Sequence, residues 1–402
     1  MRNVLFTTSA IHWPQDRTRI SGKQFSYSFT WLPAAALGAL MAGFAMPPQA
    51  LAACFVGDPG EIDCNGDVSG GVGFSSPLAY SITGAENGTV SLTVKVGGTP
   101  VQNYEVKFRK SSQLGPLSPE LDALLDYALS SNTATTNASG VASITVSGVD
   151  PGILSIESLF GAVTAEATVD VLNVNNLSAD ITPVSGTVGI SLVTDNGGYR
   201  NGGDIRINYD GGAKLLKTIN AVGVHALSIG QNGYTGSDGS FLGPDGGPGG
   251  PGTPGGIAYI DSKGEIQTTG NNAHGILAES IGGNGGPGGD DDFGFDTDGG
   301  NGGFAAGGGA ATVVSASKIT TTGTFSHGIF VQSVGGQGGS GGDAGGISAD
   351  SGEGSGAAPG GAVYVSNSGE IDTNGEDSYG ILAQSIGGFG GAGGDGGGLV
   401  AF

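Results

Sequence analysis

The sequence predicts an all-β protein, a β-sandwich followed by a parallel β-helix with glycine-rich loops. A nine-residue pattern, GGx-GGx-GGD, occurs at residues 282–290, 335–343 and 387–395. Its closing aspartates lie 53 (343−290) and 52 (395−343) positions apart, and a fixed period of this size is typical of stacked repeats. Glycine-poor stretches earlier in the chain alternate apolar and polar residues with a period of two, as half-buried strands do.

Composition and charge limit the classes of protein that fit this chain. It has 402 residues, 37% of them hydrophobic and 12% charged, and its 83 glycines are about three times the usual share. Disorder needs high charge together with low hydrophobicity, so long glycine-rich loops on a β scaffold fit better. The net charge of −22 would repel nucleic acid phosphates and anionic lipids, and we expect no nucleic acid partner.

Residues 1–52 have the pattern of a signal peptide. A basic start precedes an apolar run at 34–46, and a small-residue cleavage site follows at Ala50-Leu51-Ala52. The run is shorter than the roughly 20 residues that a membrane-spanning helix needs. Cleavage would remove four basic residues and one acidic residue, which changes the net charge from −22 to −25 (−22−3). We therefore expect an exported protein.

Cys54 allows two interpretations. Leu51-Ala52-Ala53-Cys54 has the form of a bacterial lipobox, in which an acylated Cys54 would tether the chain to a membrane. Cys54 and Cys64 are also the chain's only two cysteines, and a close pair in an oxidising compartment indicates a disulfide. We favour the disulfide, which would make residues 53–78 an N-terminal disulfide loop or cap.

Residues 79–174 are predicted to form the β-sandwich. Short segments with period-two alternation, separated by turn residues, occur at 89–96, 104–108, 141–146, 153–159 and 163–171. One packing helix is expected among them, because Ser118 can cap it, Pro119 suits its first position and an apolar stripe runs from Leu121 to Ala128.

The same region resembles the bacterial immunoglobulin-like domain of invasins and intimins. The residues that carry the resemblance are Leu92-Thr93-Val94-Lys95-Val96, Gly98-Thr99-Pro100-Val101, Val106-Lys107-Phe108 and residues 135–142. The resemblance implies a spacer or adhesive stalk. The expected helix departs from the family's usual pattern, which leaves the strand order open.

The glycine pattern belongs to a longer repeat within residues 175–402. Each unit holds three short strand-like pieces separated by glycine or asparagine turns. In a parallel β-helix each piece would pair with its equivalent in the next coil, about 4.8 Å away. The residues expected to stack inward form two ladders, Ile266, Ile319 and Ile371, and Ile276, Ile329 and Ile381.

The repeat also predicts which side chains face outward. Glu279, Gln332 and Gln384 share a position and should face outward, because a charged Glu is rarely buried unpaired. Alternation then places Ala278, Val331 and Ala383 inward and Leu277, Phe330 and Leu382 outward. An exposed apolar stripe needs a cover, so we expect the glycine loop that follows to fold back over it.

The glycine loops themselves allow two interpretations. The GGx period of three suits a left-handed helix with three residues per turn and unsatisfied backbone groups. Aligned loops on adjacent coils would then hydrogen-bond to one another. The alternative is a plain flexible loop, which the conformational entropy of glycine favours.

Asp290, Asp343 and Asp395 would lie at one position on successive coils. Like charges so close repel unless a cation bridges them, which makes these three residues calcium candidates, with solvated charge as the other interpretation. The spacing does not match the glycine-rich calcium-binding nonapeptide. No other metal or cofactor is expected.

No catalytic residues are expected. His274 and His327 share a repeat position that Tyr379 occupies in the next unit, so we assign them a packing role, and His225, aligned with Leu277, also has a structural role. The glycine runs lack the strand–turn–helix context that nucleotide binding requires.

The repeat region resembles the passenger of bacterial autotransporters with glycine-rich repeats. The residues that carry the resemblance are 275–283 with their two later copies, and the start from Cys54 to Gly66. It implies export to the outer membrane or cell surface of a Gram-negative bacterium, or release outside it, through a C-terminal barrel that is not present in this chain. The chain stops at Phe402 directly after a glycine loop. Because a solenoid needs a closing cap, we expect an incomplete passenger, a fragment of a longer protein.

We therefore expect a non-enzymatic surface or secreted passenger with an adhesive or structural role, whose partner is a surface ligand or another copy. One alternative is a polysaccharide-degrading enzyme on a β-helix, for which an arginine near clustered aspartates would be needed. The other is a calcium-stabilised surface-layer protein.

Overall fold

The computed structural model describes residues 53–56, 61–76, 80–83, 88–93, 95–96, 99–100, 102–111, 128–147, 162–166, 170–195, 202–240, 245–291, 294, 296–397 and 400–401. These residues form strands and turns and no helix, which confirms the all-β class. The signal peptide predicted for residues 1–52 lies outside them, as does the strand predicted at 153–159. Most of the predicted packing helix also lies outside them, and its expected last residue, Ala128, begins strand β9 (Ala128–Leu129).

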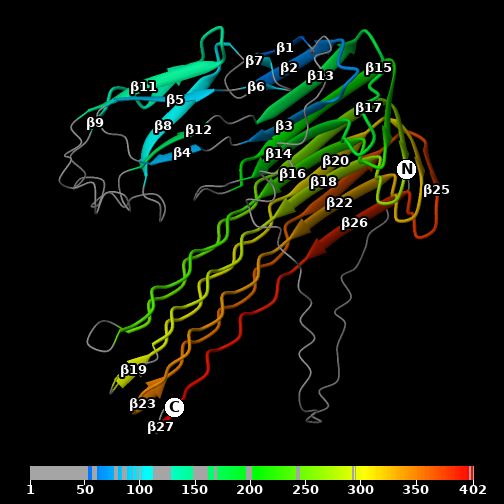
Figure 1. Ribbon diagram of the computed structural model, residues 1–402. Helices are drawn as coiled ribbons and strands as arrows, with labels where there is room; N and C mark the ends of the chain where they lie inside the picture. Colours follow the sequence, from blue (N-terminus) through cyan, green and yellow to red (C-terminus); the bar gives the residue numbers. More distant parts are fainter. Residues whose placement is uncertain are drawn as a thin grey trace. The chain divides into compact units, whose positions relative to one another are not determined.

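Two long sheets with parallel strands dominate the structure (Figure 1). The first sheet contains β1 (Ala53–Val56), β2 (Glu61–Gly66), β13 (Val171–Leu177), β15 (Ile205–Ile219), β17 (Ala258–Thr269), β20 (Ala311–Ser315), β21 (Lys318–Thr322), β24 (Val363–Asn367) and β25 (Ile371–Asn374). The second contains β3 (Val72–Ser76), β14 (Ile190–Asp195), β16 (Val224–Ile229), β18 (Ile276–Ile281), β22 (Ile329–Val334) and β26 (Ile381–Ile386). All neighbours pair in parallel except β1 and β2.

The chain crosses from the first sheet to the second once in each coil. We number the coils along the chain as coil 1 (61–76), coil 2 (171–195), coil 3 (205–229), coil 4 (258–281), coil 5 (311–334) and coil 6 (363–386). Long parallel sheets connected in this way are compatible with a β-helix or solenoid.

The two predicted isoleucine ladders are confirmed. Ile266 pairs with Ile319 and Ile319 with Ile371 in the first sheet, and Ile276, Ile329 and Ile381 pair likewise in the second. The members on coils 4 and 5 are fully buried, whereas Ile381 is 46% exposed, because coil 6 is covered by another coil on one side only. The core is therefore a stack of equivalent side chains that depends on register.

The corner between the two sheets also repeats. Asn272, Phe325 and Asp377 occupy equivalent positions in coils 4 to 6, and each has a positive φ between 54° and 56°. Asparagine and aspartate tolerate this left-handed conformation better than most residues because their short polar side chains hydrogen-bond locally. An aromatic residue at the same corner in coil 5 follows the geometry of its neighbours in the stack.

Residues 80–166 contribute two small antiparallel sheets, in the orders β10-β8-β12-β4 and β5-β11-β9, and a two-stranded pair, β6-β7. The strands are β4 (Tyr80–Thr83), β5 (Gly88–Thr93), β6 (Lys95–Val96), β7 (Thr99–Pro100), β8 (Glu105–Ser111), β9, β10 (Thr133–Thr135), β11 (Val141–Ser147) and β12 (Ala162–Glu166). Buried Val106, Phe108 and Ile144 alternate with exposed neighbours.

The coils begin before these small sheets. The expected boundaries were 53–78 for the cap, 79–174 for the sandwich and 175–402 for the repeats. In the structure β2 and β3 already pair in parallel with β13 and β14, so coil 1 precedes residues 80–166, and β13 belongs to the long sheet. The small sheets are therefore an insertion between coil 1 and coil 2.

The first coil is covered by a disulfide-bonded hairpin. Strand β1 pairs antiparallel with β2, and Cys54 lies directly opposite Cys64. The two sulfur atoms form the predicted disulfide, with a length of 2.05 Å. The thiol that lipobox acylation would modify is used in this bond.

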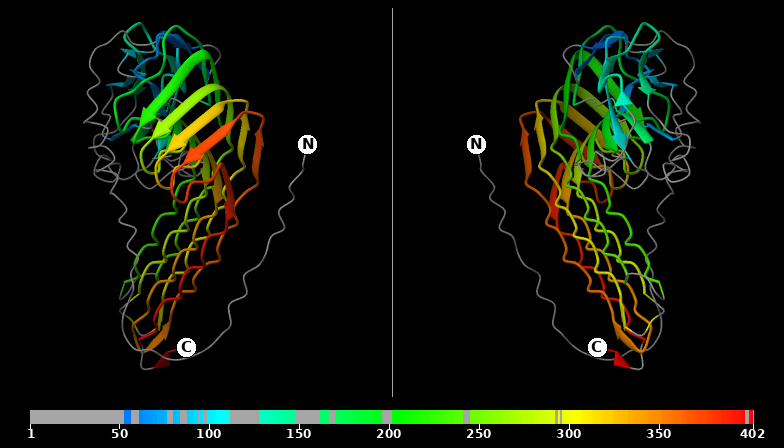
Figure 2. Two further views of the ribbon diagram at one scale, coloured as in Figure 1. Left: turned by 90° about the vertical axis from the view of Figure 1, so that its right-hand side faces the viewer. Right: turned by 90° about the vertical axis from the view of Figure 1, so that its left-hand side faces the viewer.

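Long glycine-rich segments follow the second sheet in coils 3 to 6. Figure 1 shows them continuing past the ends of β16, β18, β22 and β26 towards the short strands β19 (Asp296–Asp298), β23 (Ser348–Asp350) and β27 (Val400–Ala401). Figure 2 shows the segments of successive coils running side by side. The outgoing segments are residues 230–239, 282–291, 335–344 and 387–396, and the returning segments are 246–256, 299–309 and 351–361. Together they are called the glycine layer below.

The expectation that the glycine loops cover the outward stripe is wrong. The glycine segments hydrogen-bond to one another, and they run on from the strands rather than back across them (Figure 1). Leu277 lies between His225 and Phe330 in the strand ladder and is buried. The members of the stripe thus cover one another along the stack.

Candidate functional site

The glycine layer is ordered because each triplet satisfies its backbone in three directions. The first glycines donate their N–H groups at 2.8 Å to carbonyls of the next coil: Gly282 to the last residue of β22, and Gly285 and Gly288 to the next outgoing segment. The second glycines, one residue later in each triplet, donate to the returning segment before them at 2.8–2.9 Å. Three residues per turn send successive groups in three directions. Of the two interpretations of the glycine loops, the structure shows the one in which aligned loops hydrogen-bond to one another.

Close approach of backbone to backbone explains the glycines. A Cβ atom on Gly339 would lie 2.7 Å from the carbonyl carbon of Gly286 and 2.7 Å from the amide nitrogen of Gly303, nearer than real Cβ atoms approach. Gly286 and Gly342 are enclosed by backbone in the same way. In the outgoing segments of coils 4 to 6, the third residue of each triplet is the one with room for a large side chain, so these positions form the surface of that part of the layer.

The third positions form ladders of polar side chains. The Asn284 N–H donates to Oδ1 of Asn232 at 2.9 Å, and the Gln337 N–H donates to Oδ1 of Asn284 at 2.8 Å. A side-chain oxygen on one coil therefore accepts the backbone N–H of the next coil. This bond satisfies the remaining N–H of the triplet.

The calcium candidates form such a ladder. Asp343 donates its N–H to Oδ1 of Asp290 at 2.8 Å, and Asp395 donates to Oδ1 of Asp343 at 2.8 Å. Asp238, which the sequence analysis missed, begins the ladder by accepting from Asp290 at 3.3 Å. Within the described residues, no group of three or more His, Cys, Asp or Glu side chains is placed to hold a metal ion. A backbone donor stands against each accepting carboxylate, which offsets part of the repulsion between them.

Three aromatic side chains project from the glycine layer into solvent. Phe304 and Phe389 are each 74% exposed, and Tyr234 is 53% exposed. Phe304 stands at a third position of a returning segment and Phe389 at a third position of an outgoing segment. Large exposed apolar groups on a rigid backbone are typical of contact surfaces.

Buried serines join the glycine layer to the second sheet. The hydroxyl of Ser333 donates to the carbonyl oxygen of Gly309 and accepts from the N–H of Gly361, both at 2.7 Å. Ser280 makes the equivalent pair of bonds one coil earlier. Each serine links two successive returning segments, which fixes where the glycine layer re-enters the coil.

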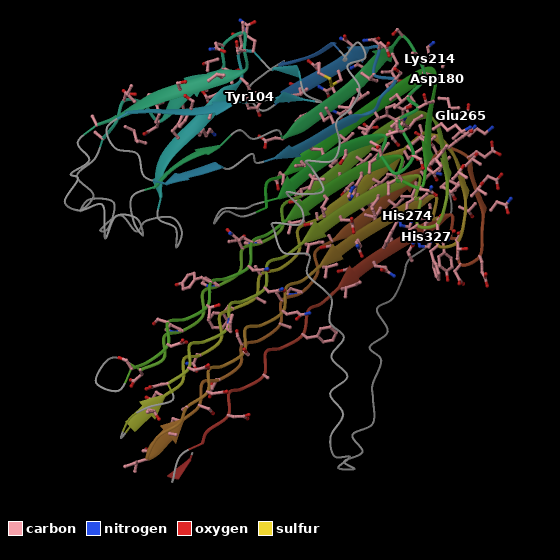
Figure 3. All side chains as sticks on the ribbon, in the orientation of Figure 1. Tyr104, Asp180, Lys214, Glu265, His274 and His327 are labelled. Atoms are coloured by element: carbon pink, nitrogen blue, oxygen red, sulfur yellow. A yellow bond between two sulfur atoms is a disulfide. The ribbon has the colours of Figure 1, made fainter. Side chains whose placement is uncertain are left out.

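Histidines form a second ladder at the start of the second-sheet strands. The rings of His274 and His327 stack with centroids 5.0 Å apart, and His327 stacks on Tyr379 at 5.4 Å (Figure 3). Phe330 packs edge-on against both histidines. Nδ1 of His274 accepts the N–H of His327, and Nδ1 of His327 accepts the N–H of Tyr379, each at 3.1 Å. The packing role assigned from the sequence is thus joined by a hydrogen bond between coils.

Burial lowers the pKa of both histidines. The pKa of His274 falls to about 4, first because burial disfavours its charged form and then because of His327. Burial also lowers the pKa of His327. Both rings are therefore neutral near pH 7.

Glu279 lies beside this ladder in a hydrogen-bonded pair. Its Oε2 is 3.0 Å from Nε2 of His225, and its Oε1 accepts from the side-chain amide of Gln332. Burial raises the pKa of Glu279, but the hydrogen bond and charge of His225, together with the hydrogen bond from Gln332, outweigh burial and hold the pKa below its ordinary value. Glu279 lies on the outer side of the sheet, as predicted, and is covered by its neighbours.

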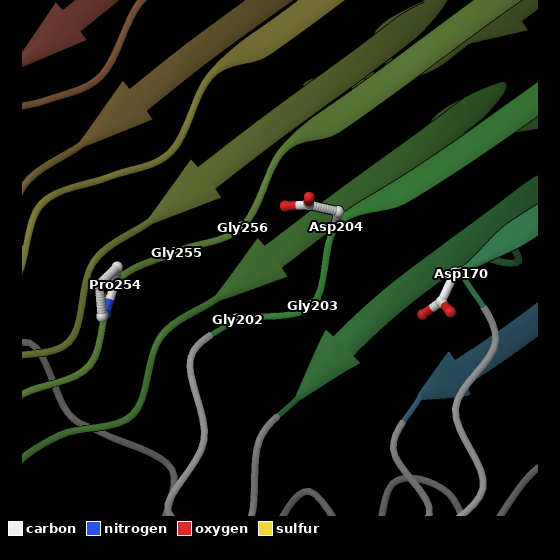
Figure 4. Close-up of a pocket in the computed structure, with 7 residues that line it drawn as sticks. All are labelled: Asp170, Gly202, Gly203, Asp204, Pro254, Gly255 and Gly256. Atoms are coloured by element: carbon white, nitrogen blue, oxygen red, sulfur yellow. The ribbon is translucent and has the colours of Figure 1, made fainter.

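A pocket of about 600 Å³ is lined by Asp170, Asp204, Pro254 and four glycines (Figure 4). Oδ1 of Asp204 accepts the N–H of Ile257 at 2.7 Å, so this carboxylate fixes the entry to β17. The lining residues include two acids, Asp170 and Asp204, and no base.

Arg206, which was not predicted from the sequence, lies on the outer side of β15. Its guanidinium is 4.5 Å from the ring centroid of Tyr259 and 4.0 Å from a carboxylate oxygen of Asp261. Its Nε donates to Oδ1 of Asn208 at 2.7 Å. The arginine is thus held by cross-strand contacts and pairs with a single aspartate.

No protein-family model, curated protein or solved structure matches the chain. Across the part of the chain that the structure describes, no helix has the length and apolar character to cross a membrane.

Proposed function

We propose that the chain is a non-enzymatic passenger region of an autotransporter, exported to the surface of a Gram-negative cell or released outside it, where it has an adhesive or structural role. The observation that carries the proposal is the glycine layer. Its backbone is fixed by hydrogen bonds in three directions, and the third positions vary between coils, as in Asn284, Gln337 and Phe389. Such a layer holds a constant shape while its surface chemistry changes.

The proposal includes a parallel β-helix as the scaffold and an immunoglobulin-like module at residues 80–166. The long parallel sheets support the first part. Two small antiparallel sheets with alternating burial support the second. The position of the module, between coil 1 and coil 2, suits a projection from the scaffold rather than a spacer in front of it.

The contacts of the acidic side chains argue against a polysaccharide-degrading enzyme. Asp290 and Asp343 accept backbone N–H groups, Asp204 fixes a strand entry, and Glu279 is paired with His225. A glycosidase needs one protonated carboxyl and one ionised carboxylate facing a common sugar. We propose no catalytic residue.

Binding and catalysis are separable in one experiment. The purified chain is incubated with immobilised acidic and neutral polysaccharides, and bound protein and released reducing ends are measured together. We expect binding to some surface, or self-association, without release of reducing ends. A Phe304→Ser, Phe389→Ser double variant should lose the binding, whereas Tyr364→Ser, which removes an exposed aromatic outside the glycine layer, should keep it. Release of reducing ends, or no binding and no self-association, would refute the proposal.

Export has its own test. Fractionation of cells that express the whole chain should place it outside the cytoplasm, with a mature N-terminus at Ala53. A chain that remains in the cytoplasm with residues 1–52 attached would refute the proposed location.

A further inference from the structure

The two ladder histidines accept hydrogen bonds in a way that fixes their protonation. Nδ1 of His274 faces the N–H of His327, and Nδ1 of His327 faces the N–H of Tyr379. A nitrogen that accepts a hydrogen bond carries no proton, so the neutral ring holds its single proton on Nε2. Each histidine thus links its own coil to the next through the neutral form only.

Protonation converts these bonds into repulsion. An imidazolium has an N–H at both ring nitrogens, so Nδ1–H would point at the backbone N–H of the next coil. Because the two rings stack 5.0 Å apart, protonation of both would also place two positive charges face to face. The same step therefore removes two hydrogen bonds between coils and adds a charge repulsion between them.

The surroundings offer little compensation for the added charge. From β16, His225 faces the ladder, and from β18, Glu279 does so, but these two are bonded to each other. From β22 the neighbours are the uncharged Phe330 and Gln332. In the turn before Tyr379, Glu376 and Asp377 are exposed to solvent.

We propose that protonation of His274 and His327 loosens coils 4 to 6 from one another, so that this part of the stack opens in acid. An acid-dependent opening would give the proposed adhesive or structural scaffold a response to the pH of its surroundings. Coils 2 and 3 lack these histidine-to-backbone hydrogen bonds, since Val222 occupies the position of His274 in coil 3.

The direction of the pH dependence follows from the neutral state of the two histidine rings in the folded stack. A histidine in an opened coil binds its proton with a pKa near 6.5, whereas His274 in the closed stack does so near 4. The open state therefore binds more protons, and the closed stack is fully favoured above pH 6.5 and weakened as the pH falls towards 4. For His274 alone the opening equilibrium rises about 30-fold at pH 5 relative to pH 7.5, and His327 adds to this change.

Hydrogen exchange on the mature chain at pH 7.5 and pH 5.0, corrected for the intrinsic effect of pH, tests the proposal. We expect β18 and β22 to lose protection at pH 5.0 by about 30-fold or more, while β14 and β16 keep theirs. No loss, or an equal loss in all four strands, would overturn the proposal.

Variants separate titration from structure. His274→Asn with His327→Asn removes the titrating rings but supplies Oδ1 acceptors, which receive backbone N–H groups elsewhere in this chain at Asn232 and Asn284. This variant should show no acid response, and His225→Gln should retain it. An acid response in the asparagine variant would overturn the proposal. If that variant does not fold, the imidazole signals of the wild-type chain decide, because a His274 that titrates near 6.5 contradicts the mechanism.

Discussion

Replacement of Gly339 by alanine is expected to open the glycine layer locally. The new Cβ would lie 2.7 Å from backbone atoms of Gly286 and Gly303. Ordinary contact begins at 3.4 Å, so the Gly303 backbone must move away by at least 0.7 Å (3.4−2.7), and the carbonyl oxygen of Gly286, which is the nearest atom, must move further still. The bond from the Gly339 N–H to the Gly303 carbonyl, now 3.0 Å, would lengthen to about 3.7 Å, beyond hydrogen-bonding distance. The bond from the Ser355 N–H to the Gly339 carbonyl would be lost with it.

The expected loss of stability follows from the loss of these two hydrogen bonds. A hydrogen bond contributes about 0.5–1.5 kcal/mol, and we take the upper value for each of these two bonds because their groups are enclosed by backbone. Alanine returns up to about 1 kcal/mol by restricting the unfolded chain. The net cost is about 2 kcal/mol, which corresponds to roughly a 30-fold increase in local opening.

Hydrogen exchange of the 351–361 segment measures this opening, because the Ser355 amide reports on the broken contact. Gly356→Ala is the matched control, since a Cβ there meets nothing within 4 Å. We expect Gly339→Ala to exchange about 30-fold faster in this segment and Gly356→Ala to exchange as slowly as the wild type or more slowly. Equal exchange in the two variants would refute the account of close backbone packing.

Three further changes test other parts of the structure. Phe325→Asn should stabilise the chain by about 1 kcal/mol in urea unfolding, because it gives the left-handed corner the residue found at Asn272, and a loss of stability would contradict this. Ser333→Ala should cost about 2–3 kcal/mol and speed exchange in the returning segments, because it leaves buried backbone groups of both segments unpaired, so unchanged exchange would count against the serine link. Reduction of the disulfide between Cys54 and Cys64, which are 10 residues apart, should cost about 3 kcal/mol, and a melting curve that reductant does not alter would exclude a stabilising role.

The repeat made the core of coils 4 to 6 predictable. Where the same residue type returns at a fixed spacing, as at Ile276, Ile329 and Ile381, the register and the facing of each strand follow from the period. The period of three in the glycine segments likewise led to mutual hydrogen bonds as one of the two interpretations of these loops. Both inferences depend only on local pattern and its repetition.

Coils 1 and 2 were not predictable in this way. Their buried residues, such as Ile62 and Leu172, occupy core positions without the glycine signature of the later coils. The strands that carry them pair across the inserted small sheets, with Asn173 bonded to Asp63 110 residues away. A pairing over that distance leaves no periodic pattern in the sequence. Residues 79–174 were therefore predicted to be a separate domain in front of the repeats.

The cover of the outward-facing apolar stripe and the hydrogen bonds of the histidines could not be predicted for a different reason. Leu277 and Phe330 were expected to need a loop as cover, but stacking at 52–53-residue intervals lets such side chains cover one another. The acceptor role of Nδ1 in His274 and His327 depends on the atomic position of the next coil's backbone. Residue type alone carries no sign of it.

The most direct test of the central claim is a disulfide cross-link between successive coils in the whole chain. Thr320 and Asp372 are register partners on the outer side of β21 and β25, and parallel strands lie about 4.8 Å apart, within the range that a disulfide spans. A Thr320→Cys, Asp372→Cys variant should therefore form the link on mild oxidation, as shown by mass spectrometry. The Thr320→Cys, Asn374→Cys variant, two residues out of register at about 8 Å, should not. If the second pair links as well as the first, or the first does not link at all, the coils do not stack as described.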